Sequence, residues 1–221
     1  MTSVKTRVKL YKAIKTNNFD KFLKYIYKMT NINDVIYSSV CFYTILGTPL
    51  FFACKYKRPD MVQELIQNNA SININAGHLN TDYPQKPLDM TLMNNDITTF
   101  KILVNAGIPI IVSRKFFRST LMNSTQFAAR YAGSELLDYY FSKFGTEDIN
   151  SFAKKHHDYY NNNFNKFLTP LMIACCLGKL DKVKILIKYG AKINITANKY
   201  TAMRLAEINK RFEIVNYLES L

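Results

Sequence analysis

The sequence lacks a long apolar run, and it holds only seven glycines and six prolines among 221 residues. A membrane span requires roughly 20 consecutive apolar residues, so we expect no integral membrane span. Scarce glycine and proline, together with abundant aromatic residues, exclude an extended disordered chain. The charged first residues lead into no apolar segment, which argues against a secretory signal peptide. We therefore expect a folded protein of the cytoplasm.

Cysteines are few and lack the spacing of a metal site or a disulfide framework. The four are Cys41, Cys54, Cys175 and Cys176, and no CxxC pair is among them. Side chains of adjacent residues on a helix also point in different directions. We therefore predict four reduced packing residues, with no disulfide and no metal site.

Motifs that carry catalytic chemistry are also lacking. Neither GxGxxG nor GxxxxGK[ST] occurs, so the sequence contains no nucleotide cradle. The run His156-His157-Asp158 has no further ligand at metal spacing, and adjacent side chains rarely converge on one ion. Glu147 and Asp148 have no carboxylate placed opposite them, as acid–base catalysis would need. The sequence predicts no enzyme, no catalytic residue, no cofactor and no small-molecule substrate.

The charge is strongly positive, with 30 basic and 16 acidic residues giving a net charge of +14. Such an excess favours an acidic partner or an anionic surface. The basic residues are spread along the chain rather than gathered in a recognisable nucleic-acid module, so nucleic acid is disfavoured. We expect an acidic protein partner and keep a basic scaffold for nucleic acid or acidic lipid as the alternative.

The clearest pattern in the sequence is an internal repeat. Its best copy runs from Thr169-Pro170-Leu171 to Asn194, and similar openings begin at Thr48, Lys86 and Thr201. Weaker openings lie near residues 8 and 124. The conserved features have physical reasons: Thr caps a helix, Pro suits the first helical position, and Gly suits the helix end. Small residues recur where two helices must approach closely, and they are Ala13, Ala53, Ala129, Ala174 and Ala206.

These openings closely resemble those of ankyrin-repeat proteins, whose signature contains T-P-L at the start of each unit. The resemblance implies an all-α solenoid of about six helix-turn-helix units with irregular insertions. It implies a single array over residues 1–221, with the longest insertion at about 144–168. The units open near residues 8, 48, 86, 124, 169 and 201. One pair cannot bury its apolar faces alone, so neighbouring pairs must stack into one core.

The resemblance also implies where a partner binds, because such proteins bind partners on a concave face made by turn tips and first helices. The candidate partner-binding residues are Lys55, Tyr56, Tyr83, Met93, Tyr131, Lys166 and Asn198. Further positions on that face are Lys15, Thr16, Asn94, Ala132, Cys176, Leu177, Ile208 and Asn209. Aromatic residues and Met are enriched in interfaces. Two alternatives stay open: Met93 and Tyr131 pack between units, or the insert Lys115-Phe116-Phe117-Arg118 makes the contact.

Composition adds a hypothesis about biological role. The sequence is rich in Lys, Asn, Ile and Tyr, which is typical of an AT-rich genome. Ankyrin arrays of this kind are common in intracellular bacteria, giant viruses and poxviruses. The analogy suggests a monomeric effector or host-range factor that occupies a host protein in the host cell cytosol. It is an analogy of fold and composition only.

Overall fold

The computed structural model describes residues 2–40, 43–74, 77–78, 86–109, 114–116, 120–152, 154–155, 168–197 and 199–221. These residues form twelve helices and six short strands. They fall into two compact units, Met1–Pro109 and Ile110–Leu221, each of which is described by itself. None of the helices in the described part of the chain has the length and hydropathy that crossing a bilayer requires.

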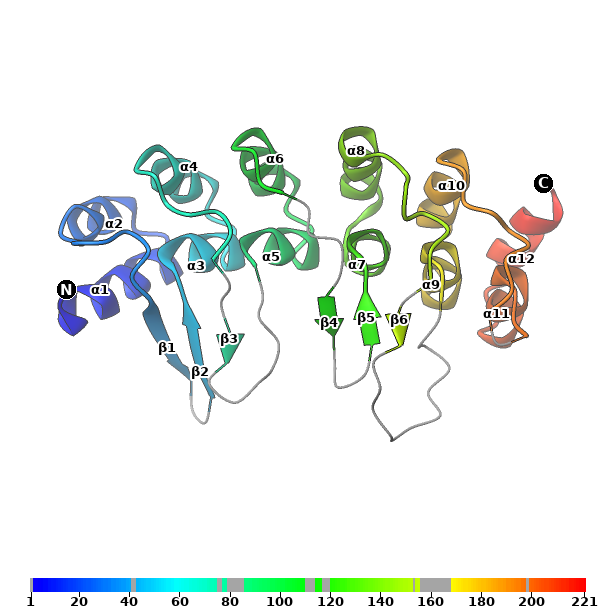
Figure 1. Cartoon of the computed structure of the whole chain (residues 1–221), viewed down its shortest axis with the longest axis horizontal. Helices are drawn as coiled ribbons and strands as arrows, with labels where there is room; N and C mark the ends of the chain where they lie inside the picture. Colours follow the sequence, from blue (N-terminus) through cyan, green and yellow to red (C-terminus); the bar gives the residue numbers. More distant parts are fainter. Residues whose placement is uncertain are drawn as a thin grey trace. The chain divides into compact units, whose positions relative to one another are not determined.

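The N-terminal unit contains three helix pairs and three strands. The pairs are α1 (Val4–Lys15) with α2 (Phe19–Ile26), α3 (Pro49–Lys55) with α4 (Pro59–Gln67), and α5 (Pro87–Met93) with α6 (Ile97–Asn105). The strands are β1 (Ile36–Val40), β2 (Tyr43–Gly47) and β3 (Gly77–His78). Within this unit α3 packs between α1 and α5 in one row, and α2, α4 and α6 lie in a second row (Figure 1).

The C-terminal unit has the same organisation. Its pairs are α7 (Ser124–Tyr131) with α8 (Ser134–Phe144), α9 (Pro170–Leu177) with α10 (Leu180–Lys188), and α11 (Ala202–Ile208) with α12 (Phe212–Glu219). The strands are β4 (Arg114–Phe116), β5 (Thr120–Met122) and β6 (Lys154–Lys155). Helix α9 packs between α7 and α11, and α10 contacts both α8 and α12. The predicted all-α architecture of about six helix pairs is confirmed.

The strands in the connecting segments were not predicted. In the N-terminal unit β1 and β2 pair in antiparallel fashion from Ile36 opposite Gly47 to Val40 opposite Tyr43, and β3 adds to the edge of β2. In the C-terminal unit β4, β5 and β6 form a second three-stranded sheet. The β1 and β2 segments are rich in Ile, Val, Tyr and Thr, which favour strands. A search for helix-pair signatures passes over this signal.

In each pair, the helix that comes first in the chain is called the first helix. Local capping explains where these helices begin. The Oγ1 atom of Thr48 accepts a hydrogen bond from the Phe51 amide at 3.2 Å, and that of Thr169 accepts from Met172 at 3.3 Å. Such side-chain acceptors satisfy amides that have no partner within the helix. Helix α1 starts at Val4, with Ser3 as its N-cap, about one turn before the predicted opening near residue 8.

Neighbouring pairs are also joined at the C-terminal ends of their first helices. Arg58 donates from Nε to the Ile14 carbonyl at 3.2 Å and from Nη2 to the Lys15 carbonyl at 3.1 Å. In the C-terminal unit, Lys182 Nζ donates in a similar way to the carbonyls of Ala129 at 3.0 Å and Arg130 at 3.3 Å, at the end of α7. Positive side chains are favourable there because the last carbonyls lack helical donors and carry the negative end of the helix dipole.

The fourth pair differs by one residue from the predicted register. The N-cap of α7 is Asn123, and Lys182 contacts the carbonyls of Ala129 and Arg130 as Arg58 contacts those of Ile14 and Lys15. Since Ile14 directly follows Ala13, the residue equivalent to Ala13 is Ala128, not Ala129. Both alanines are fully buried, so either satisfies the packing requirement.

Candidate functional site

Four of the seven candidate partner-binding residues lie in the part of the chain that the structure describes, and all four are at the C-terminal ends of first helices. Lys55 is the last residue of α3 and Tyr56 is its C-cap, while Met93 ends α5. In the other unit Tyr131 ends α7. Three further candidates, Tyr83, Lys166 and Asn198, lie outside the described residues.

The N-terminal first-helix face consists of Lys15, Lys55, Tyr56, Met93 and Asn94. Tyr56 is held there by other aromatic rings: it stacks on Phe52, with centroids 6.3 Å apart and planes 17° apart. Its hydroxyl lies 2.8 Å from that of Tyr11. A half-buried tyrosine fixed in this way loses little further freedom on binding a partner, which favours affinity.

Two other residues complete this face. Asn94 donates from Nδ2 to the Lys55 carbonyl at 2.8 Å and so ties the end of α5 to the end of α3. Burial lowers the pKa of Lys55, a residue that is only partly exposed. Met93 remains 37% exposed, so packing between pairs uses only part of its surface. The rest is available to a partner.

Tyr131, in the C-terminal unit, is more deeply engaged. Its ring lies 4.7 Å from that of Phe127, and the Arg130 guanidinium sits 5.6 Å from the Tyr131 centroid. Arg130 Nε also donates to the Tyr131 hydroxyl at 3.3 Å. Burial raises the pKa of Tyr131, against the opposing effect of Arg130. Tyr131 is therefore compatible with both interpretations, packing inside the chain and contact with a partner. It packs within its unit, yet its side chain stays half-exposed.

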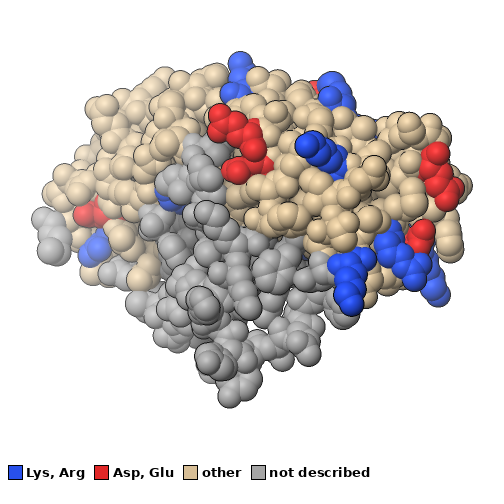
Figure 2. Space-filling view, turned by 45° about the vertical axis from the view of Figure 1, so that its right-hand side comes forward, with Lys and Arg blue, Asp and Glu red and all other residues tan. Residues whose placement is uncertain are grey.

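Charged side chains are not gathered into one patch on the face drawn in Figure 2, where basic and acidic side chains are interspersed with neutral surface. Some of the charge is compensated locally. Lys188 pairs with Asp138 at 2.8 Å and Arg204 with Glu207 at 2.6 Å. Exposed pairs of this kind contribute little to stability, but they reduce the field that an anionic polymer would meet.

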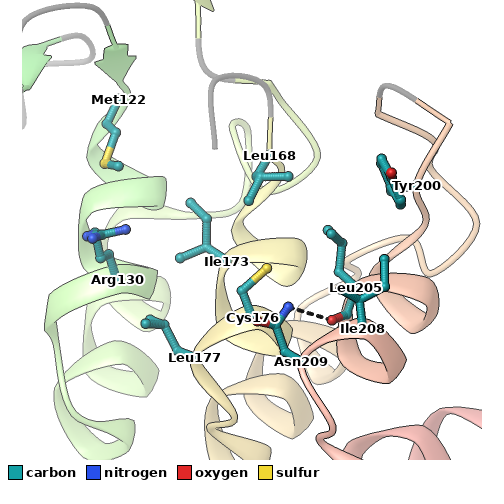
Figure 3. A pocket seen from close by; sticks show the side chains of 10 residues that line it. All are labelled: Met122, Arg130, Leu168, Ile173, Cys176, Leu177, Tyr200, Leu205, Ile208 and Asn209. Atoms are coloured by element: carbon teal, nitrogen blue, oxygen red, sulfur yellow. Dashed lines mark hydrogen bonds between the residues drawn. The ribbon is translucent and has the colours of Figure 1, made fainter. Parts of the chain in front are cut away.

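A pocket of about 400 Å³ opens among α7, α9 and α11 of the C-terminal unit. It is lined by Met122, Arg130, Leu168, Ile173, Cys176, Leu177, Tyr200, Leu205, Ile208 and Asn209, and we call it the C-terminal pocket. Figure 3 shows side chains from the three helices facing one space. Leu168, Ile173 and Leu205 are buried, whereas Ile208 is 51% exposed. The pocket therefore has an apolar floor and an open rim.

Four pocket residues belong to the positions that the resemblance assigned to a partner-binding face: Cys176, Leu177, Ile208 and Asn209. Arg130 was missed, because the predicted register placed Tyr131 and Ala132 there instead. A capping box marks the correct register: Asn123 Oδ1 accepts from the Gln126 amide at 2.7 Å, and Gln126 Oε1 accepts from the Asn123 amide at 2.9 Å. The spacing of Asn and Gln is visible in the sequence.

The buried thiols of two first helices, α3 and α9, are poor nucleophiles. Burial raises the pKa of the Cys175 thiol to about 12 and also raises that of Cys54, so both thiols stay protonated and poorly nucleophilic at neutral pH. Among the described residues no group of three or more His, Cys, Asp and Glu is placed to hold a metal ion. Cys41 and the run His156-His157-Asp158 lie outside that part of the chain.

Comparison with known families agrees with the helix-pair architecture. A family model described as Ankyrin repeats (3 copies) matches residues 126–220, and one described as Ankyrin repeat matches residues 46–74. No curated protein matches the chain significantly. Ankyrin repeats are generally protein–protein interaction modules and typically carry no catalytic activity. The chain is an ankyrin-repeat protein.

Proposed function

We propose that this chain is a non-catalytic module that binds a partner protein through its first-helix faces. The observation that carries the proposal is the composition of the first-helix ends. Tyr56 is fixed but half-exposed, Met93 is 37% exposed, and the C-terminal pocket opens beside Ile208. Aromatic and Met side chains are enriched in interfaces, where a few residues, Tyr prominent among them, dominate the binding energy. We also propose that all six pairs act as one array.

An acidic partner fits the charge of this surface. Lys15 and Lys55 lie at neighbouring first-helix ends of the N-terminal unit, and Arg130 lines the pocket of the other. Complementary charge accelerates association and sets specificity. The interspersed charges in Figure 2 disfavour the alternative, a scaffold for nucleic acid or acidic lipid. That alternative requires affinity to fall steeply with salt, so a salt titration with DNA and with acidic vesicles tests it.

The finer proposal concerns biological role. The composition analogy supports an effector or host-range factor that occupies a host protein inside the host cell. Such an inhibitor needs only a binding surface, which is what the first-helix faces offer. Expression of the chain in cultured host cells, with and without the binding-face substitutions below, tests whether any cellular effect depends on that surface.

The direct test is partner capture followed by quantitative binding. The full chain is used as bait in host lysate, captured proteins are identified by mass spectrometry, and the main one is purified. Its Kd is then measured with wild type and with the double variant Tyr56→Ala, Met93→Ala. We expect the double variant to bind at least about tenfold more weakly, as loss of central interface residues does.

A matched control separates binding from folding. Phe19→Ala with Tyr27→Ala removes one moderately and one largely exposed side chain at α2, outside the first-helix row, where Tyr27 is 68% exposed. This control should bind as wild type does. Equal Kd values for both double variants, with intact helical circular dichroism, would refute the assignment of the first-helix face.

A further inference from the structure

We infer that the C-terminal pocket receives a large apolar side chain from a partner-protein segment that carries acidic residues beside it. The inference rests on the proposed function and specifies one contact within it. It depends on three properties of the pocket, namely its apolar floor, its open rim and the positive groups at its edge.

The floor is built to exclude water. Leu168, Ile173 and Leu205 come from the segment before α9, from α9 and from α11, and all three are buried. Met122, at the end of β5, closes the same space and is also buried. Apolar walls contributed by separate elements give a guest side chain contacts on several sides.

The rim favours a protein segment over a small free ligand. Ile208 leaves 51% of its surface exposed and Asn209 beside it is exposed as well, so the pocket is open on the α11 side. A site for a free ligand buries most of the ligand's surface, whereas this pocket is open along the side formed by Ile208 and Asn209. A side chain anchored on a larger partner needs only to fill the floor, and its flanking backbone then covers Ile208.

The edge of the pocket is positive. Arg130 is one of the ten lining residues, and none of those ten is acidic. Arg211 lies over Gly178 directly after α9: a Cβ atom at Gly178 would stand 2.7 Å from Arg211 Cδ. Its charge also acts on the thiol of Cys176 inside the pocket, where it opposes the rise in pKa caused by burial. Arg130 therefore lines the pocket, and Arg211 lies close to Gly178 and Cys176 beside it. A guanidinium favours carboxylates.

Nearby acids do not cancel this charge. Glu207 is adjacent to Ile208 in sequence but is paired with Arg204 at 2.6 Å. Arg130 forms no ion pair within the described part of the chain, and its Nε bonds to Tyr131. The combination predicts a guest with one large apolar residue and at least one neighbouring Asp or Glu.

The test uses a random peptide library displayed on phage and selected against the full chain. We expect enriched peptides to share a large apolar residue next to acidic residues. Synthetic versions should bind Ile208→Asp and Arg130→Glu at least tenfold more weakly than wild type. Replacing the acids of the peptide with lysine should restore binding to Arg130→Glu.

Matched controls carry the same chemical changes away from the pocket. Leu221→Asp places an acid at an exposed apolar residue after α12, and Lys143→Glu reverses an exposed charge on α8. Both should bind the peptides as wild type does. A second readout needs no substitution. A bound peptide should slow the alkylation of Cys176 by at least fivefold, as measured by mass spectrometry of the tryptic fragment that contains it.

Three outcomes would overturn the inference: no enriched consensus, a consensus without acids, or unchanged alkylation of Cys176 in the complex. A dimer of the chain that Ile208→Asp abolishes would also overturn it, since a second copy would then fill the pocket. None of these outcomes removes the proposed function, because the captured partner and its dependence on Tyr56 and Met93 are measured independently.

Discussion

The Lys182 ammonium donates hydrogen bonds to the carbonyls of Ala129 at 3.0 Å and Arg130 at 3.3 Å. This side chain from α10 thereby secures the C-terminal end of α7, which carries Arg130 and Tyr131 of the candidate surface. In the N-terminal unit Arg58 does the same for α1. The contact that joins neighbouring helix pairs is thus also the contact that positions a helix end with candidate partner-binding residues.

Replacing Lys182 with Met should destabilise the C-terminal unit. The buried Ala129 carbonyl and the part-buried Arg130 carbonyl would lose their donor, at a cost of about 1–3 kcal/mol in the free energy of unfolding. Urea denaturation at pH 7 measures the change. Lys192→Met, at an exposed lysine in the turn after α10, should alter stability by less than about 0.5 kcal/mol. Equal effects of the two substitutions would show that the bonds to α7 contribute nothing.

The same lysine gives a pH dependence of defined sign. Burial, aided by the charge of Lys179, lowers the pKa of Lys182 to about 8, against about 10.4 in an unfolded chain. Between these values the unfolded chain holds the proton and the folded chain does not, so stability rises with pH. Between pH 7.5 and 9.5, the free energy of unfolding of wild type should rise by about 1–2 kcal/mol relative to that of Lys182→Met. If the difference in free energy between the two proteins stays constant or shrinks with pH, the lowered pKa of Lys182 is contradicted.

Buried thiols should act in the opposite direction. The pKa of Cys175 is raised to about 12 by burial, whereas an unfolded thiol titrates near 8.5. Above that pH the unfolded chain loses the proton and the folded chain keeps it, so stability falls. Between pH 7 and 10, the free energy of unfolding of wild type should fall by about 1–2 kcal/mol relative to that of Cys175→Ala, with both proteins measured in the presence of a reductant. Parallel pH profiles of the two proteins would rule this out.

Asn150 should be a second link between helix pairs. Its Nδ2 donates to the Gly190 carbonyl at 3.1 Å, and its Oδ1 accepts from the Lys192 amide at 2.8 Å, so one side chain joins two connecting turns. Asn150→Ala should lower the free energy of unfolding by about 1–2 kcal/mol. Asn216→Ala, at an exposed position of α12, serves as the control and should be close to neutral in the same urea titration.

The fold was predictable where local chemistry and repeat spacing agree. Thr48-Pro49 and Thr169-Pro170 each combine a capping side chain with a proline suited to the first turn, and both mark real helix starts. The register of the fourth pair was not obtained, because Ala128 and Ala129 are adjacent and equally small. Only the capping box at Asn123 decides between them.

The candidate surface was predictable in part. Position within the repeat identified Tyr56, Met93, Cys176 and Ile208 as first-helix ends, which is where the structure places them. The C-terminal pocket was not predictable, since it depends on how side chains from residues 122 to 209 fill the space among three helices. Periodicity reports which face of a helix is buried, but not where packing leaves a gap.

Side-chain footprinting of the complex shows which face of the chain a partner covers. Hydroxyl radicals oxidise exposed Met and Tyr, so the chain is footprinted alone and with its captured partner. We expect strong protection of Met93 and Tyr56 on the first-helix face and none of Tyr27, which is exposed after α2. Protection of Tyr27 with unchanged oxidation of Met93 and Tyr56 would contradict binding through that face.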